Sequence, residues 1–168
     1  MKKTRMLTRA VIAFALCCSM LTGAAMAAGP ARVVDLNGMT VTFNDKLPDV
    51  MPYASSETFI DEVRTTTHPF SISRACHPAN GNHLVLFLEN QGTTPIQISI
   101  TLTKDGKTIR DTQIIEPKKP TQMNWPTYVT TANGNNGEGL TCTFTYEVKP
   151  SIIGQEITYW AFCQQRFE

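Results

Sequence analysis

A strict alternation of apolar and polar residues fills the segment 96–103. Its apolar positions are Ile96, Ile98, Ile100 and Leu102, and its polar positions are Gln97, Ser99, Thr101 and Thr103. Side chains of a strand point alternately to the two faces of a sheet, so this pattern predicts a strand with one buried face. Asp105-Gly106 predicts a tight turn, and the segment 108–116 predicts the returning strand. A chain that contains this segment is therefore constrained to form a β-sheet.

Further strands are predicted on both sides of this pair. The segments 31–36 and 39–43 flank Asn37-Gly38, a dipeptide that tolerates the positive φ angles of a hairpin turn. The run from Leu84 to Leu88 is apolar throughout and predicts a central strand that is buried on both faces. The remaining predicted strands cover 70–72, 121–125, 141–149 and 156–164, and an Asn- and Gly-rich loop is expected at 133–139.

The segment 44–69 is the hardest to place. Pro48 and Pro52 oppose regular structure, whereas Phe59, Ile60 and Val63 fit one face of a short helix or an extended segment equally well. We therefore expect an irregular segment here. About eight short strands at this spacing predict a mainly β fold, an antiparallel β-sandwich that forms a single domain over residues 28–168.

The segment from Leu86 to Val148 resembles a small immunoglobulin-like or fibronectin-like extracellular module. The resemblance rests on the regular spacing of the predicted strands and on the sequence Leu88-Glu89-Asn90-Gln91-Gly92. It implies an architecture and no particular family, and it assigns no functional residue.

The first 27 residues have the order of regions that marks a bacterial secretory signal peptide. An apolar stretch, Val11 to Leu21, precedes Ala25-Met26-Ala27, which has small residues where a signal peptidase cleaves. The basic residues that begin the segment are Lys2, Lys3, Arg5 and Arg9. We expect cleavage after Ala27 and a mature protein that is secreted or associated with the cell envelope. The apolar stretch is shorter than the ~20 residues of a membrane-spanning helix.

The predicted mature chain is mildly acidic. All 14 acidic residues follow residue 27, whereas four of the 15 basic residues precede it, so 11 basic and 14 acidic side chains give a formal charge of −3. This balance gives no broad electrostatic reason to bind nucleic acid or anionic lipid. Neither partner is expected.

Three cysteines, Cys76, Cys142 and Cys163, follow the predicted signal peptide. In an oxidising compartment, three cysteines predict one disulfide and one remaining thiol. If the last two strands form a hairpin about Ile152-Ile153, Cys142 lies opposite Cys163. We therefore predict a Cys142–Cys163 disulfide, with a bond from Cys76 to either of them as the competing pairing.

Aromatic residues are the candidate ligand-binding residues, because their rings present rigid contact area at a low entropy cost. The candidates are Trp125, Tyr128 and Trp160, and the alternative for each is burial in the core. The hairpin register places Trp160 beside Phe162 on the face opposite Cys163. Asp61-Glu62 is interpreted as a solvated surface pair.

No catalytic or metal-binding residue is nominated. Cys76 and His77 are neighbours on an extended chain and would point to opposite faces, which makes a poor catalytic dyad. The spacing of His68, His77 and His83 relative to Cys76 matches no compact zinc pattern. We expect no cofactor.

These observations favour a secreted, non-enzymatic binding or interaction module of a bacterium. Its expected partner is an extracellular protein or a surface polymer. Two alternatives remain open: a small secreted hydrolase whose site is assembled from distant strands, and an inhibitor of an extracellular protease.

Overall fold

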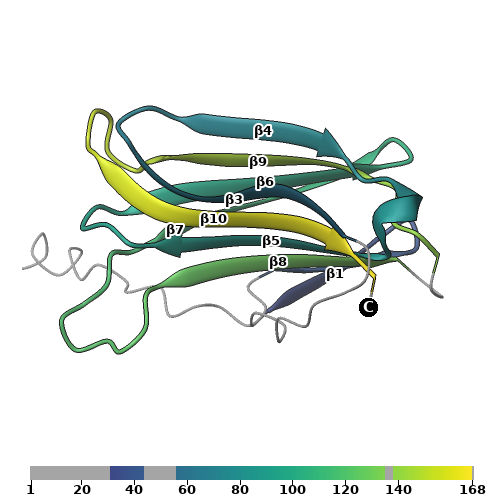
Figure 1. Ribbon diagram of the computed structural model, residues 1–168, viewed down its shortest axis with the longest axis horizontal. Helices are drawn as coiled ribbons and strands as arrows, with labels where there is room; N and C mark the ends of the chain where they lie inside the picture. The colour runs from purple at the N-terminus through teal and green to yellow at the C-terminus, as the bar shows by residue number, and fades with distance from the viewer. Residues whose placement is uncertain (1–30, 44–55, 135–137, 168) are drawn as a thin grey trace, which may run out of the picture.

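Two antiparallel β-sheets form the protein (Figure 1). The computed structural model describes residues 31–43, 56–134 and 138–167. The larger sheet has six strands in the order β1 (Arg32–Leu36), β2 (Met39–Phe43), β8 (Thr127–Gly134), β5 (His83–Asn90), β10 (Ile157–Arg166) and β3 (Ser56–Thr66). The smaller sheet has four, in the order β4 (Phe70–Ala75), β9 (Thr143–Pro150), β6 (Ile96–Lys104) and β7 (Lys107–Ile115). The predicted antiparallel β-sandwich is confirmed, and the described residues form ten strands instead of about eight.

The predicted turns lie where the sequence places them. Asn37 and Gly38 have φ angles of 50° and 76° between β1 and β2, and Asp105 and Gly106 have φ angles of 48° and 77° between β6 and β7. Positive φ at both central residues matches the twist of a two-residue hairpin. The chain therefore reverses at these two points through local sequence alone.

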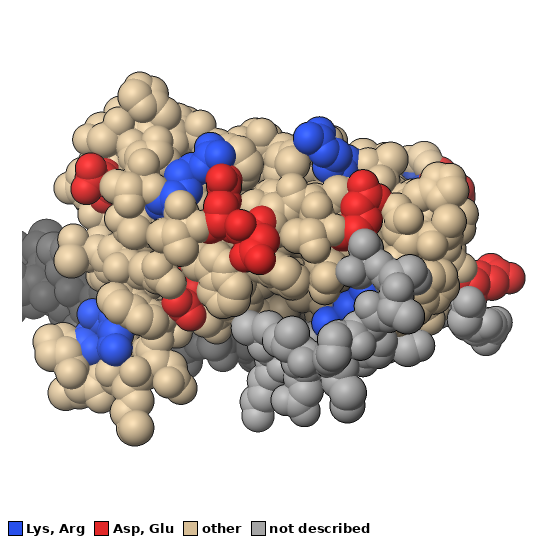
Figure 2. Space-filling view, in the orientation of Figure 1, with Lys and Arg blue, Asp and Glu red and all other residues tan. Residues whose placement is uncertain are grey.

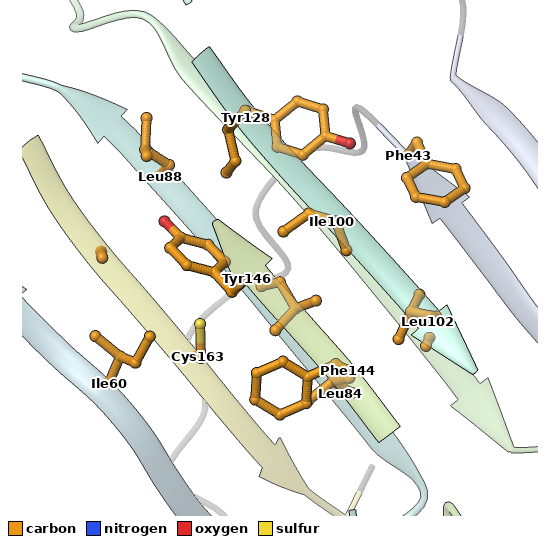
Figure 3. Close-up of a cluster of buried hydrophobic side chains, with 14 of the residues drawn as sticks. Phe43, Ile60, Leu84, Leu88, Ile100, Leu102, Tyr128, Phe144, Tyr146 and Cys163 are labelled. Carbon is orange, nitrogen blue, oxygen red and sulfur yellow. The ribbon is translucent and has the colours of Figure 1, made fainter. Parts of the chain in front are cut away.

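The core lies between the two sheets and follows the predicted alternation. In β6 the apolar positions face inward, and Ile96, Ile98, Ile100 and Leu102 are fully buried. Figure 3 shows side chains from both sheets meeting there, with Phe144 and Tyr146 of β9 beside Cys163 of β10. The central strand β5 is buried on both faces from His83 to Leu88, as predicted for the apolar run.

Three predicted details are wrong. Residues 56–66, within the segment expected to be irregular, form the long strand β3 at an edge of the larger sheet, so the extended alternative for Phe59, Ile60 and Val63 is the correct one. Residues 121–125 are not a strand, and β8 instead covers Thr127–Gly134, which includes the start of the expected loop at 133–139. In both places the pairing with a strand distant in sequence overrides a weak local pattern.

The third error concerns the last two strands. They exist as predicted but do not pair with each other, because β9 lies between β4 and β6 whereas β10 lies between β5 and β3. Ser151 to Glu156 therefore carries the chain from one sheet to the other. Cys142 and Cys163 consequently lie in different layers, and all three described cysteines are unbonded, so the predicted Cys142–Cys163 disulfide is wrong.

The predicted signal peptide lies outside the described residues, as does the segment 44–55. Within the described ranges, no helix has the length and apolar character needed to cross a membrane. The one helical element there is a short 3-10 turn, Pro78–Asn80.

The side-chain amide of Gln165 organises the end of the sandwich that carries this turn. Its oxygen accepts a hydrogen bond from the backbone N–H of His77 at 3.0 Å. Its nitrogen donates to the carbonyls of His77 and Gly81, each at 2.8 Å, and of Leu140 at 3.3 Å. Gln165 is fully buried, so these bonds satisfy backbone groups that water does not reach.

We predict that Gln165→Leu lowers the free energy of unfolding by about 2–4 kcal/mol, because it leaves several buried backbone groups without a partner. Urea unfolding at neutral pH measures the change. Gln164→Leu is the matched control, since Gln164 is half-buried on the opposite face of the same strand. If both variants lose the same free energy of unfolding, the role assigned to the buried amide of Gln165 is contradicted.

Three tyrosines are buried in the core, and burial raises the pKa of each phenol. The pKa of Tyr159 is raised to about 12. Tyr146 donates its hydroxyl to the carbonyl of Phe87 at 3.0 Å, whereas the buried hydroxyl of Tyr159 has no hydrogen-bond partner among the described residues. The two tyrosines are thus both buried, but only the hydroxyl of Tyr146 has a hydrogen-bond partner among the described residues.

This contrast predicts different effects of removing each hydroxyl. Tyr146→Phe should cost about 1 kcal/mol of unfolding free energy, because a buried hydrogen bond is lost. Tyr159→Phe should leave the stability unchanged or raise it, because an unsatisfied polar atom is removed from the core. Chemical denaturation of the two variants at pH 7 provides the comparison, and a larger loss for Tyr159→Phe would refute it.

Candidate functional site

The outer face of the six-stranded sheet carries an apolar cluster separate from the main core. Val85, Phe87 and Val129 are buried in it, and the half-buried rings of Trp160 and Phe162 pack against them. Alternation along β10 produces this arrangement, since Tyr159, Ala161 and Cys163 face the core and Trp160 and Phe162 face outward. The predicted orientation of Trp160 beside Phe162 is therefore observed.

The indole of Trp160 is held by two contacts. Its ring N–H donates to a carboxylate oxygen of Asp61 on β3 at 3.0 Å. Its ring meets that of Phe87 on β5 edge to face, with centroids 5.0 Å apart and planes inclined by 68°. Edge-to-face pairs of this kind are favourable beyond the area they bury. These contacts consequently fix the orientation of the indole in the unbound protein.

Polar groups and one exposed apolar side chain surround this ring. Val63 lies directly opposite Trp160 on β3 and is 61% exposed, and Glu89 lies directly opposite on β5. The amide nitrogen of Gln91 donates to the Glu89 carboxylate at 2.7 Å. We call Asp61, Val63, Glu89, Gln91 and Trp160 the Trp160 surface. Figure 2 shows acidic side chains across the middle of the face on which β3 and β10 run.

The chemistry of the Trp160 surface suits a polar ligand with a flat apolar side. An indole offers stacking area, and two carboxylates offer hydrogen-bond acceptors on either side of it. Hydrogen bonds to ionised carboxylates are about twice as strong as bonds between neutral groups. The surface therefore combines an aromatic contact with directional acceptors.

The three aromatic candidates do not form one strip. Trp125 is 39% exposed in the connection between β7 and β8, and the Lys118 ammonium lies 4.9 Å from the centre of its ring. Pro126, next to it, accepts a hydrogen bond from Asn90, so this connection lies at the same end of the larger sheet as Glu89 and Trp160 (left in Figure 1). Trp125 and Trp160 thus share one end of the protein.

Tyr128 lies elsewhere. Its side chain is 1% exposed between the sheets, and its hydroxyl donates to Asp111 at 2.6 Å. Burial and the hydrogen bond to Asp111 raise the pKa of this phenol. Asp111 also pairs with Arg32 at 3.3 Å, so the tyrosine contributes to a polar link between β1, β7 and β8. Its side chain is not available to a surface ligand in this structure.

A second polar region lies on the outer face of the smaller sheet. A hollow of about 250 Å³ is lined there by Pro69, Phe70, Ser71, Gln97, Ser99, Arg110, Glu147, Val148 and Lys149. The guanidinium of Arg110 pairs with Glu147 at 2.8 Å across the hollow. Arg110 is thus already paired with a neighbouring carboxylate. The aromatic ring in the lining, that of the half-buried Phe70, is already covered by the guanidinium of Arg64, 4.0 Å from the ring centre.

The histidines do not converge with the cysteines. The His77 ring accepts a hydrogen bond from Ala79, His68 contacts Thr67, and His83 contacts Asn133. Within the described part of the chain, no group of three or more His, Cys, Asp or Glu side chains is arranged to hold a metal ion.

The sequence indicated only Trp160 among the five members of the Trp160 surface, and the two carboxylates, Asp61 and Glu89, were not indicated as site residues. Asp61 and Trp160 are 99 positions apart, and Glu89 reaches Trp160 only because β5 pairs with β10. Asp61 was interpreted as part of a solvated pair. The one local signal was the alternation around Trp160, which indicates the face but not its neighbours.

No family model matches the chain, and no curated protein matches it. Among solved structures, the chain is similar to the enzymatically active domain of tailspike protein 4 of bacteriophage CBA120, with 18% sequence identity and a TM-score of 0.31. The match covers 79% of this chain and 18% of the tailspike chain, so it spans a small part of that protein. A likeness at this level establishes neither a shared fold nor a shared activity.

Proposed function

We propose that the protein is a secreted, non-enzymatic binding module of a bacterium that holds a surface polysaccharide on the Trp160 surface. The observation that carries the proposal is the fixed indole of Trp160 between the carboxylates of Asp61 and Glu89. Sugar rings present an apolar face to an aromatic ring and hydroxyl donors to carboxylates, so they match both features.

The pre-set geometry of the indole supports the same proposal. Because Asp61 and Phe87 already fix the ring, binding costs little additional side-chain entropy. Val63, exposed beside the ring, extends the apolar contact. A repeating polymer also suits an open sheet face. When one repeat of the polysaccharide is bound, the neighbouring repeats are held close to the protein, so several weak contacts together raise the affinity.

The extracytoplasmic location rests on the predicted signal peptide. When the full chain is expressed in a bacterium, we expect the exported protein to begin at Ala28. N-terminal sequencing of the protein recovered outside the cytoplasm determines the start. A chain that still begins at Met1 and stays with the cells would contradict both the predicted cleavage and the secreted role.

The binding proposal predicts that Trp160→Ala weakens polysaccharide binding about tenfold or more, because truncating a central aromatic contact costs about 1.4 kcal/mol or more. Affinity electrophoresis in gels containing bacterial and plant polysaccharides measures the retardation of the exported protein. Asp61→Asn should weaken binding less, since its side-chain oxygen remains an acceptor.

Ile114→Ala is the matched control, because Ile114 is 56% exposed on the outer face of the smaller sheet. It should leave the retardation unchanged. Equal retardation of the Trp160→Ala variant and the unmodified protein would refute the assigned surface. Release of reducing sugar ends from a polymer would instead support the hydrolase alternative.

A further inference from the structure

Cys76 and Cys142 occupy directly opposite positions on neighbouring strands. Cys76 follows the last residue of β4, and Cys142 precedes the first residue of β9. Ala75 is paired with Thr143, so one further step along the antiparallel ladder places the two cysteines opposite each other. The backbone N–H of Cys76 donates to the carbonyl of Cys142 at 2.7 Å, which shows that the ladder continues through this pair.

The two side chains point the same way. Residues opposite each other in an antiparallel pair share a face, and their Cβ atoms are ~4.5–5.5 Å apart. Both belong to the main core cluster, and each is only 7% exposed. A hydrogen bond between the two thiols raises the pKa of Cys76 and lowers the pKa of Cys142. The two thiols thus face each other at the edge of the core.

Cys163 has different surroundings. It belongs to β10 in the other sheet, it is fully buried, and burial raises the pKa of its thiol well above the ordinary value. Figure 3 shows it among Ile60, Tyr146 and Phe144. The three cysteines therefore divide into one facing pair and one isolated core thiol.

We propose that Cys76 and Cys142 form a modification site, a dithiol that a small disulfide oxidant converts into a covalent link between β4 and β9. One thiolate attacks a sulfur of the oxidant and releases one thiol. The second thiolate then attacks the mixed disulfide, forms the Cys76–Cys142 bond and releases the second thiol. The protein loses two electrons and two protons, and the oxidant is reduced to two thiols.

The fold explains why this pair suits the reaction. Directly opposite strand positions with a hydrogen bond between them bring the Cα atoms to ~5.5 Å, inside the ~4.4–6.8 Å range that disulfides span. The bond then requires a side-chain rotation and a small approach of the two strands, because the Cβ atoms of a disulfide lie ~3.5–4.5 Å apart. The link would close a loop that contains β5, β6, β7 and β8, and a loop of this length restricts the unfolded chain strongly. It lies at the opposite end of the sandwich from the Trp160 surface, so it is independent of the proposed ligand (Figure 1).

Peptide mapping of the oxidised protein tests the proposal. The exported protein, which is expected to begin at Ala28, is purified with reductant, the reductant is removed, and glutathione disulfide is added. Cleavage after Lys, Arg and Glu places Cys76, Cys142 and Cys163 on three different peptides. We expect a linked Cys76–Cys142 peptide under non-reducing conditions, while Cys163 stays open to alkylation after denaturation. Alkylation of both Cys76 and Cys142, or a linked peptide that contains Cys163, would overturn the proposal.

Thermal unfolding supplies a second measurement. Oxidation should raise the Tm by about 5–10 °C, and added dithiothreitol should reverse the shift. Cys142→Ser should abolish the shift, whereas Cys163→Ala should retain it. If Cys142→Ser fails to fold, the peptide map of the unmodified protein still decides the outcome. A Tm shift that persists in folded Cys142→Ser protein would count against the pair.

Discussion

Burial of the inner faces of the two sheets against each other is the constraint on which the rest of the structure depends. Neither sheet is covered by a helix among the described residues, so the apolar side of each strand is buried by the opposite layer. The connection between β9 and β10 serves this arrangement by moving the chain from one layer to the other. Phe144 and Tyr146 of β9 then meet Cys163 of β10 across the core (Figure 3).

Local patterns predicted much of this fold, and non-local pairing set the rest. The alternation from Ile96 to Thr103 and the turns at Asn37-Gly38 and Asp105-Gly106 require only neighbouring residues, and they were predicted correctly. Alternation determines which face a side chain occupies but not which strand lies beside it. For this reason the parity of β9 and β10 was right while their pairing, and with it the Cys142–Cys163 bond, was wrong.

The same distinction applies to the Trp160 surface. The outward direction of Trp160 follows from alternation along β10, whereas Asp61 and Glu89 become its neighbours only when β3 and β5 pair with β10 on either side. The apolar positions of the segment that contains β3 fit a helix and an extended segment equally well, because charged residues interrupt them. The tertiary pairing that created β3 therefore also supplied the carboxylate that holds the indole.

The position of β3 has a consequence for how the protein behaves among copies of itself. An edge strand exposes unpaired backbone groups that can recruit another chain. β3 lies at an edge of the larger sheet, carries Glu57, Asp61, Glu62 and Arg64 along its length, and its pairing with β10 is interrupted by a register shift between Cys163 and Gln164. Charge and local irregularity are two features that hinder edge-to-edge addition of strands. The strand that completes the larger sheet thus also discourages its growth into an aggregate.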